Sequence, residues 1–116
     1  MEEHPESRGK TTINPEVLMT IARLTALSVP GISRMASGPH GVDNLIKRHY
    51  SDGVKIEVEN NTVYIDLFIV LFSKTDLRQT SHKIQKKVNR AISEMVGMDI
   101  GHINIHIEDI DFASTE

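Results

Sequence analysis

The stretch that decides the fold is VKIEVENNTVYIDLFIVLFS, residues 54–73. Apolar and charged side chains alternate over residues 54–59, which is typical of a strand with one buried face. Asn60 and Asn61 then suit a tight turn, because asparagine tolerates a positive φ. A longer apolar strand follows from Thr62 to Ser73. We therefore expect an antiparallel hairpin.

A helix is expected before this hairpin. Asn14 can cap its free amide groups, Pro15 suits the first helical position, and Glu16 complements the helix dipole. Pro30-Gly31 is expected to stop the helix. Its apolar residues recur at helical spacing and predict one buried stripe, made of Val17, Leu18, Ile21, Ala22, Thr25 and Val29.

A second helix is expected after the hairpin. Thr75 or Asp76 can cap its start, and Gly97 stands where a C-terminal cap would. Its predicted buried stripe comprises Leu77, Ser81, Ile84, Val88, Ile92 and Met95. A final strand is expected from His102 to Glu108, and the spacing of the next apolar residues predicts a bulge or strand end near Asp109.

The remaining segments are less regular. Residues 10–13 can form a short edge strand, residues 37–41 are rich in turn formers, and residues 42–50 can form a short helix. The order of elements predicts an α+β fold with two layers: a mixed sheet of three or four strands, and two main helices packed on one face. We expect one domain over residues 10–112, a disordered tail over 1–9 and a short tail over 113–116.

Composition narrows the class of protein. The chain of 116 residues has 13 basic and 16 acidic residues, a net charge of −3, which does not favour nucleic acid as the main partner. It has no cysteine, which fits a reducing cytosol. The N-terminal sequence lacks the order of a signal peptide, and the longest apolar run is far shorter than the ~20 residues that span a bilayer. We expect a cytoplasmic protein with no membrane span of its own.

Several short segments share an order and spacing with one bacterial family. They are residues 13–17 with 21–22, 29–32, 53–58, 63–67, 84–85 with 88, and 95–98 leading into 103–107. Together they resemble the alkaline-shock (envelope stress response) family of small cytoplasmic proteins, over residues 9–112. The resemblance implies a link to cell-envelope homeostasis, a small membrane-protein partner in some members, and self-assembly in others. It carries no active site. The sequence departs from the family pattern at residues 72–74, where a Tyr-Gly pair is common.

The long strand has an unusual second face. Apolar side chains continue on it, although the helices are expected to cover only the first face. Burying a phenylalanine is worth about 2–3 kcal/mol, so these side chains must be covered by residues 32–50 of the chain or by another chain. A candidate partner or self-association face therefore consists of Tyr64, Phe68, Val70 and Phe72.

The second helix carries a basic side away from its apolar stripe, formed by Lys83, Lys86, Lys87 and Arg90. These side chains can meet anionic lipid headgroups, at ~1 kcal/mol per basic residue, or an acidic protein partner, or RNA phosphates. They can also be a solvated face that only keeps the protein soluble.

Metal-ligand types gather on the second sheet face: Glu57, Asp66, His102 and His106. Two residues four apart on a strand are ~13 Å apart at the α-carbon, so one ion would not easily take both histidines. We expect surface histidines, with no metal site and no cofactor. No nucleophile motif, phosphate loop or dinucleotide glycine pattern is present, so we expect no catalytic residues and no enzyme activity.

Two functions are consistent with these features. The first is an envelope stress adaptor or scaffold that binds proteins near the membrane, including a small membrane-anchored protein or further copies of itself. The alternative is an RNA-binding module similar to a KH domain, in which the Gly-x-x-Gly of residues 38–41 clamps the nucleic-acid backbone beside the basic second helix. Pro39 and His40 supply little positive charge to such a loop.

Overall fold

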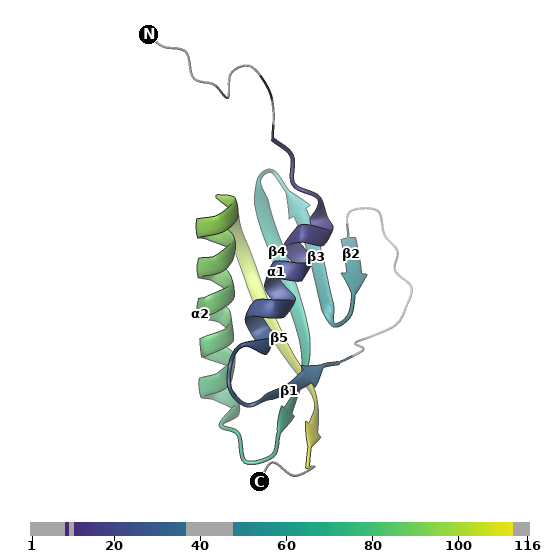
Figure 1. Ribbon diagram of the computed structural model, residues 1–116, viewed down its shortest axis with the longest axis vertical. Coiled ribbons are helices and arrows are strands. Elements are labelled where there is room, and N and C mark those ends of the chain that lie inside the picture. The colour runs from purple at the N-terminus through teal and green to yellow at the C-terminus, as the bar shows by residue number, and fades with distance from the viewer. Residues whose placement is uncertain (1–8, 10, 37–47, 113–116) are drawn as a thin grey trace.

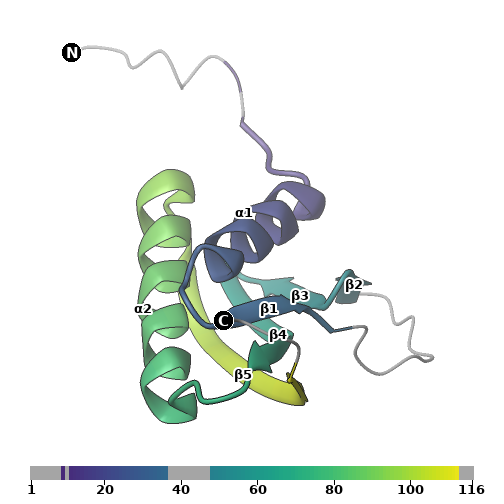
Figure 2. The same ribbon diagram turned by 60° about the horizontal axis from the view of Figure 1, so that its bottom comes forward.

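The computed structural model describes residues 9, 11–36 and 48–112 of the chain. The elements are α1 (Pro15–Leu27), β1 (Ile32–Met35), β2 (Arg48–Ser51), β3 (Val54–Glu59), β4 (Thr62–Phe72), α2 (Leu77–Val96) and β5 (Asp99–Asp111). The five strands form one mixed sheet, and both helices lie on the same face of it (Figures 1 and 2). The structure is therefore a two-layer α+β fold, as the sequence predicts.

Strand β4 is the centre of the sheet. It pairs in parallel with β5 along its whole length, and α2 makes the crossover between them. On its other edge it pairs antiparallel with β3 over residues 62–67 and with β1 over residues 69–71. The predicted hairpin is confirmed, with Asn60 and Asn61 at φ 52° and 63° in its turn.

Along one edge of β4, the pairing with β3 stops and the pairing with β1 starts at Phe68. Its N–H donates to the carbonyl of Gly53 at 2.8 Å, and its carbonyl accepts from the N–H of Ala36 at 2.7 Å. Gly53 has φ +78°, and a Cβ there would lie 2.7 Å from the Ala36 carbonyl oxygen. The junction therefore depends on glycine, because a larger residue would be strained and would clash with the backbone.

The helix ends follow the predicted capping. The Asn14 side chain accepts from the N–H of Glu16 at 2.9 Å, and Asp76 accepts from the N–H of Gln79 at 3.0 Å. Asp76 is thus the cap of α2, and Gly97 ends that helix in the left-handed conformation at φ 76°. Such caps supply partners for amide and carbonyl groups that the helix itself leaves unpaired.

The structure corrects several predictions about the sheet. Five strands are present within residues 11–36 and 48–112, where three or four were expected, because β1 and β2 lie in residues 32–53, whose sequence has no regular pattern. Residues 48–51 form β2, where the end of a short helix was expected, and residues 11–13 form no strand. The final strand is longer than expected at both ends. Its predicted bulge is confirmed, since Ile107 pairs with Ile69 whereas Asp109 pairs with Val70.

Helix α1 is rotated relative to its predicted stripe. Its buried residues are Leu18, Met19, Ala22 and Ala26, whereas Val17 is 47% exposed. Ile21 and Thr25 are only partly buried. The fully buried Ala22 and Ala26 have small side chains that let the helix approach the sheet closely, so the side of Val17 turns outward.

The core between the layers is aliphatic. Ile84, Val88 and Ile92 of α2 are fully buried against the odd-numbered side chains of β4, among them Ile65 and Leu67. Such close-packed side chains lose both transfer free energy and contacts when they are shortened.

We expect Ile84→Ala to lower the free energy of unfolding by about 2–5 kcal/mol, because it removes a buried branched side chain and leaves a cavity. Lys86→Ala, two residues further on the exposed side, should change it by less than about 0.5 kcal/mol. Urea unfolding followed by circular dichroism measures both variants. Equal stability of the two variants would contradict this account of the core.

Candidate functional site

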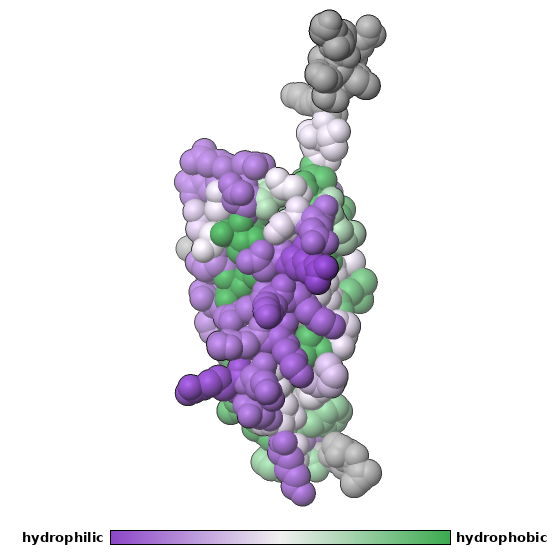
Figure 3. Space-filling view, turned by 90° about the vertical axis from the view of Figure 1, so that its left-hand side faces the viewer, coloured by the Kyte–Doolittle hydropathy of each residue, from purple (hydrophilic) through white to green (hydrophobic). Residues whose placement is uncertain are grey.

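The basic side of α2 is exposed as predicted. Lys83, Lys86, Lys87 and Arg90 all lie outside the row of Ile84, Val88 and Ile92 that packs on the sheet. Arg90 forms an ion pair with Glu94 at 3.2 Å, whereas Lys83, Lys86 and Lys87 have no ion pair among the residues that the structure describes. Figure 3 faces this side of the molecule and shows hydrophilic side chains over most of it, with smaller hydrophobic patches among them.

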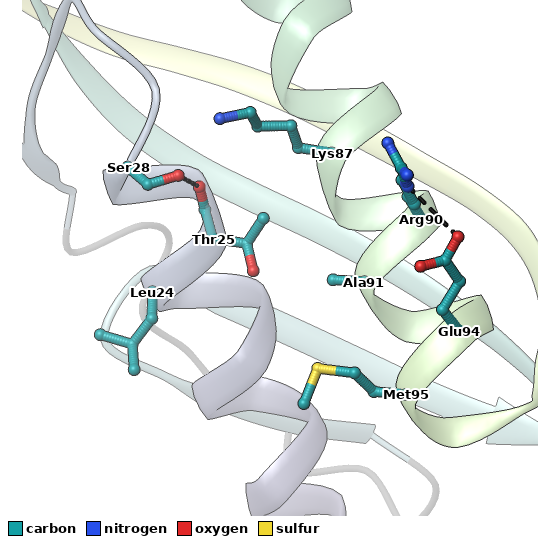
Figure 4. A pocket seen from close by; sticks show the side chains of 8 residues that line it. All are labelled: Leu24, Thr25, Ser28, Lys87, Arg90, Ala91, Glu94 and Met95. Atoms are coloured by element: carbon teal, nitrogen blue, oxygen red, sulfur yellow. Dashed lines mark hydrogen bonds and ion pairs between the residues drawn. The ribbon is translucent and has the colours of Figure 1, made fainter.

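An open groove of about 550 Å³ lies beside this basic side, between the two helices (Figure 4). Side chains of both helices line it: Leu24, Thr25, Ser28, Lys87, Arg90, Ala91, Glu94 and Met95. Leu24 is 58% exposed and Met95 is 70% exposed. The groove was missed in the sequence, because the periodicity assigned Thr25 and Met95 to the core and gave Leu24 no role.

The second face of the sheet is buried in part within the chain. Phe68 and Val70 are buried and form one cluster with Ala36. The ring of Phe68 stacks on His106, with ring centroids 4.5 Å apart and planes at 13°. Ala36 belongs to the 32–50 segment that the sequence offered as one of two covers, and residues 37–47 lie outside the described residues. Phe68 and Val70 are therefore not open contacts for a partner.

Tyr64 and Phe72 are half-buried at the two ends of the same face. The Tyr64 ring lies over Gly101, where a Cβ would come within 2.2 Å of it, and packs edge-on against His102 with ring centroids 5.2 Å apart. Docking of a partner or a second copy on this face stays a prediction, with Tyr64 and Phe72 as the side chains still within reach.

Asp66 is the polar centre of this face. Its Oδ1 lies 2.8 Å from Nε2 of His106 and accepts from the Asn104 amide at 3.2 Å. Its Oδ2 lies 3.8 Å from Nε2 of His102. The two histidines thus converge on one carboxylate although their α-carbons are far apart. No group of three His, Asp or Glu side chains within residues 11–36 and 48–112 is arranged to hold a metal ion.

The pKa of Asp66 reflects opposing effects. Burial raises this pKa, but hydrogen bonds from His106 and Asn104, with the positive charges of His106 and Lys55, outweigh burial and hold the pKa below its ordinary value. A carboxyl whose pKa is lowered by folding stabilises the fold above its unfolded-state pKa. That stability is lost as pH falls through the folded-state pKa.

The Gly-x-x-Gly at residues 38–41 lies outside the described residues. The strand β2 begins at Arg48, so the helix predicted over residues 42–50 does not extend into residues 48–50. The order helix, loop, helix suggested a KH domain, but the end of the second expected helix is a strand. Among the described helices, none is long and apolar enough to cross a membrane.

We expect His106→Ala to raise the pKa of Asp66, because it removes a hydrogen bond and a positive charge while the carboxyl stays partly buried. NMR titration of the Asp66 carboxyl carbon measures the shift. The stability lost on acidification should also become smaller, since the gap between folded-state and unfolded-state pKa narrows. His82→Ala, on the exposed side of α2, is the control. An unchanged pKa of Asp66 in the first variant would contradict the assignment.

Comparison with known proteins gives the chain its relatives. A model of the alkaline-shock protein 23 family, described by a cell envelope-related function, matches residues 3–112. The protein YqhY of Bacillus subtilis (strain 168) is 30% identical over 108 residues, which cover 90% of this chain and 78% of YqhY. YloU of the same strain is 27% identical over 106 residues, which cover 88% of each chain. Both relatives are described as uncharacterized proteins.

Solved structures of similar fold come from another protein. The MamM-CTD 215-293 structure has a TM-score of 0.52 at 16% identity, covering 83% of this chain and 99% of its own. The copper form of the MamM CTD has a TM-score of 0.52 at 15% identity, covering 87% and 91%. At this identity the likeness concerns the fold alone. The family model spans nearly the whole chain, and the resemblance found in its segments is confirmed: this protein belongs to the alkaline-shock protein 23 family, whose function is related to the cell envelope.

Proposed function

We propose that this protein is a non-enzymatic adaptor or scaffold of the cell envelope, which works in the cytoplasm by binding a protein partner near the membrane. The observation that carries the proposal is the exposed layer of α1 and α2. There, lysines with no ion pair among the described residues lie beside an open, mainly apolar groove. Surfaces that combine exposed apolar side chains with a charged rim are typical of sites that bind other proteins.

The distribution of charge supports a partner with acidic groups. Helix α2 contains five basic residues and one acidic residue, Glu94, a net charge of +4 in a chain whose net charge is −3. A positive face on an otherwise negative molecule orients an approaching acidic partner and raises the rate of association. A small membrane-anchored protein with an acidic cytoplasmic segment would be held in this way.

Binding rather than catalysis also fits the polar groups of the sheet face. Asp66 is engaged by His106 and Asn104, and the rings of Tyr64 and Phe68 pack on His102 and His106. These side chains satisfy one another, and the hollow beside them is only about 170 Å³. A general base is expected to be available to a substrate, whereas the Asp66 carboxylate is already bonded to His106 and Asn104.

We expect Lys86→Glu/Lys87→Glu to reduce the recovery of the protein with membrane fractions, and of any co-purifying partner, from its own cells. The reason is that the double variant cancels the positive charge of the basic side without touching the core. The control Arg34→Glu/Lys74→Glu changes the net charge equally at exposed positions outside α2 and should leave both recoveries unchanged.

Quantitative mass spectrometry of tagged wild-type and variant proteins measures these recoveries. The absence of any specific partner for the wild-type protein, or equal losses in the two double variants, would contradict the proposed function.

A further inference from the structure

We propose that the groove between α1 and α2 binds an amphipathic helix of the partner protein, with its apolar stripe in the groove and acidic side chains toward α2. The inference rests on the proposed function, in that it assumes a protein partner, and it adds the site and the chemistry of that partner.

Three apolar side chains line the groove, and two of them are exposed. Leu24 of α1 and Met95 of α2 expose 58% and 70% of their surface, and Ala91 leaves space between them because its side chain is short. In Figure 4, Met95 and Lys87 reach from α2 toward α1. Leu24 shares one side of α1 with Ile21 and Val17, since residues three, four and seven apart lie on one side of a helix.

The two walls differ in charge. The α1 wall ends in the neutral residues Thr25 and Ser28, and the Ser28 hydroxyl donates to the Thr25 carbonyl at 2.6 Å. The α2 wall carries Lys87 and Arg90. Within the part of the chain that the structure describes, Arg90 pairs with Glu94 and Lys87 has no ion pair. A ligand in the groove thus meets uncharged side chains on the α1 flank and a net positive charge on the α2 flank.

A helix matches this arrangement. A helix is about 10 Å across with its side chains and packs its ridges into the groove between two others. Helix-in-groove recognition uses apolar anchors at i, i+3, i+4 and i+7, which Leu24, Ala91 and Met95 can receive. Acidic residues on the flank toward α2 would pair with Lys87 and set the orientation of the helix.

The shape of the site distinguishes a helix from a lipid surface. An anionic membrane could meet the same lysines, but a flat surface would touch only the rims of the groove and leave its floor at Ala91 unfilled. RNA is disfavoured because the groove has no aromatic side chain on which a base could stack.

The test uses the full chain labelled with ¹⁵N and a fluorescent helical peptide of about 18 residues, long enough for several turns. The peptide carries leucine at i, i+3, i+4 and i+7 and glutamate along one flank. A second peptide carries lysine in place of each glutamate. We expect the acidic peptide to bind at least about tenfold more tightly and to shift the amide signals of Leu24, Ser28, Ala91 and Met95.

Two variants locate the interaction. Lys87→Glu should weaken binding of the acidic peptide, whereas Lys86→Glu, the same change on the neighbouring residue outside the groove lining, should weaken it much less. Ala91→Phe should abolish binding by filling the groove. Leu24→Lys provides a second block at a position so exposed that folding should be unaffected, and circular dichroism checks both variants.

Other outcomes would overturn the inference. These are shifts confined to the sheet face, equal binding of both peptides, groove shifts with anionic vesicles but not with the peptide, or a dimer that Leu24→Lys dissolves. A pull-down separates this proposal from the broader one. If Leu24→Lys retains the cellular partner that Lys86→Glu/Lys87→Glu loses, the groove is not the binding site but the adaptor function is still supported. If the wild-type protein binds no partner, the adaptor function fails.

Discussion

The central constraint on this structure is that β4 must pair with three other strands and also bury side chains on both of its faces. It pairs with β5 along one edge and with β3 and then β1 along the other. Its odd-numbered side chains face the helices, and its even-numbered Phe68 and Val70 are also buried. The second half of β4 must therefore be apolar on both faces. This explains why apolar and polar side chains stop alternating after Asp66.

The change of partner strand at Phe68 gives the chain its shape. Because β3 leaves β4 at this residue, the edge is free for β1, and the backbone of Phe68 bonds to Gly53 on one side and Ala36 on the other. The connection from α1 is thereby tied to the middle of the sheet. It also brings Ala36 beside Phe68, where it forms one buried cluster with Phe68 and Val70 on the second face.

Local signals were enough to predict the hairpin, both helices with their caps, and the bulge near Asp109. They failed for β1 and β2, because four-residue strands have too few side chains to show alternation and depend on pairing with β4 and β3. The basic side of α2 was predictable, since charged residues must point away from a buried row.

The groove was not predictable, and the reason is geometric. The series of Val17, Ile21 and Thr25 and the series of Leu18, Ala22 and Ala26 are both apolar enough to form a core stripe, and they differ by one residue, or about 100° around the helix. Only packing against the sheet decides between them, and it selects the series with two alanines. The other series is left away from the sheet, and its Thr25 lines the groove beside α2.

This rotation also indicates which side of the molecule is free to bind. On the sheet face, Asp66 is held by His106 and Asn104, and the aromatic rings pack on histidines and on Gly101. On the helical face, Leu24 and Met95 are exposed, and Lys87 has no ion pair among the described residues. Exposed apolar area and an uncompensated charge both become more favourable when another chain covers them. Binding of a partner is therefore expected to be more favourable on the helical layer than on the apolar sheet face that the sequence analysis proposed.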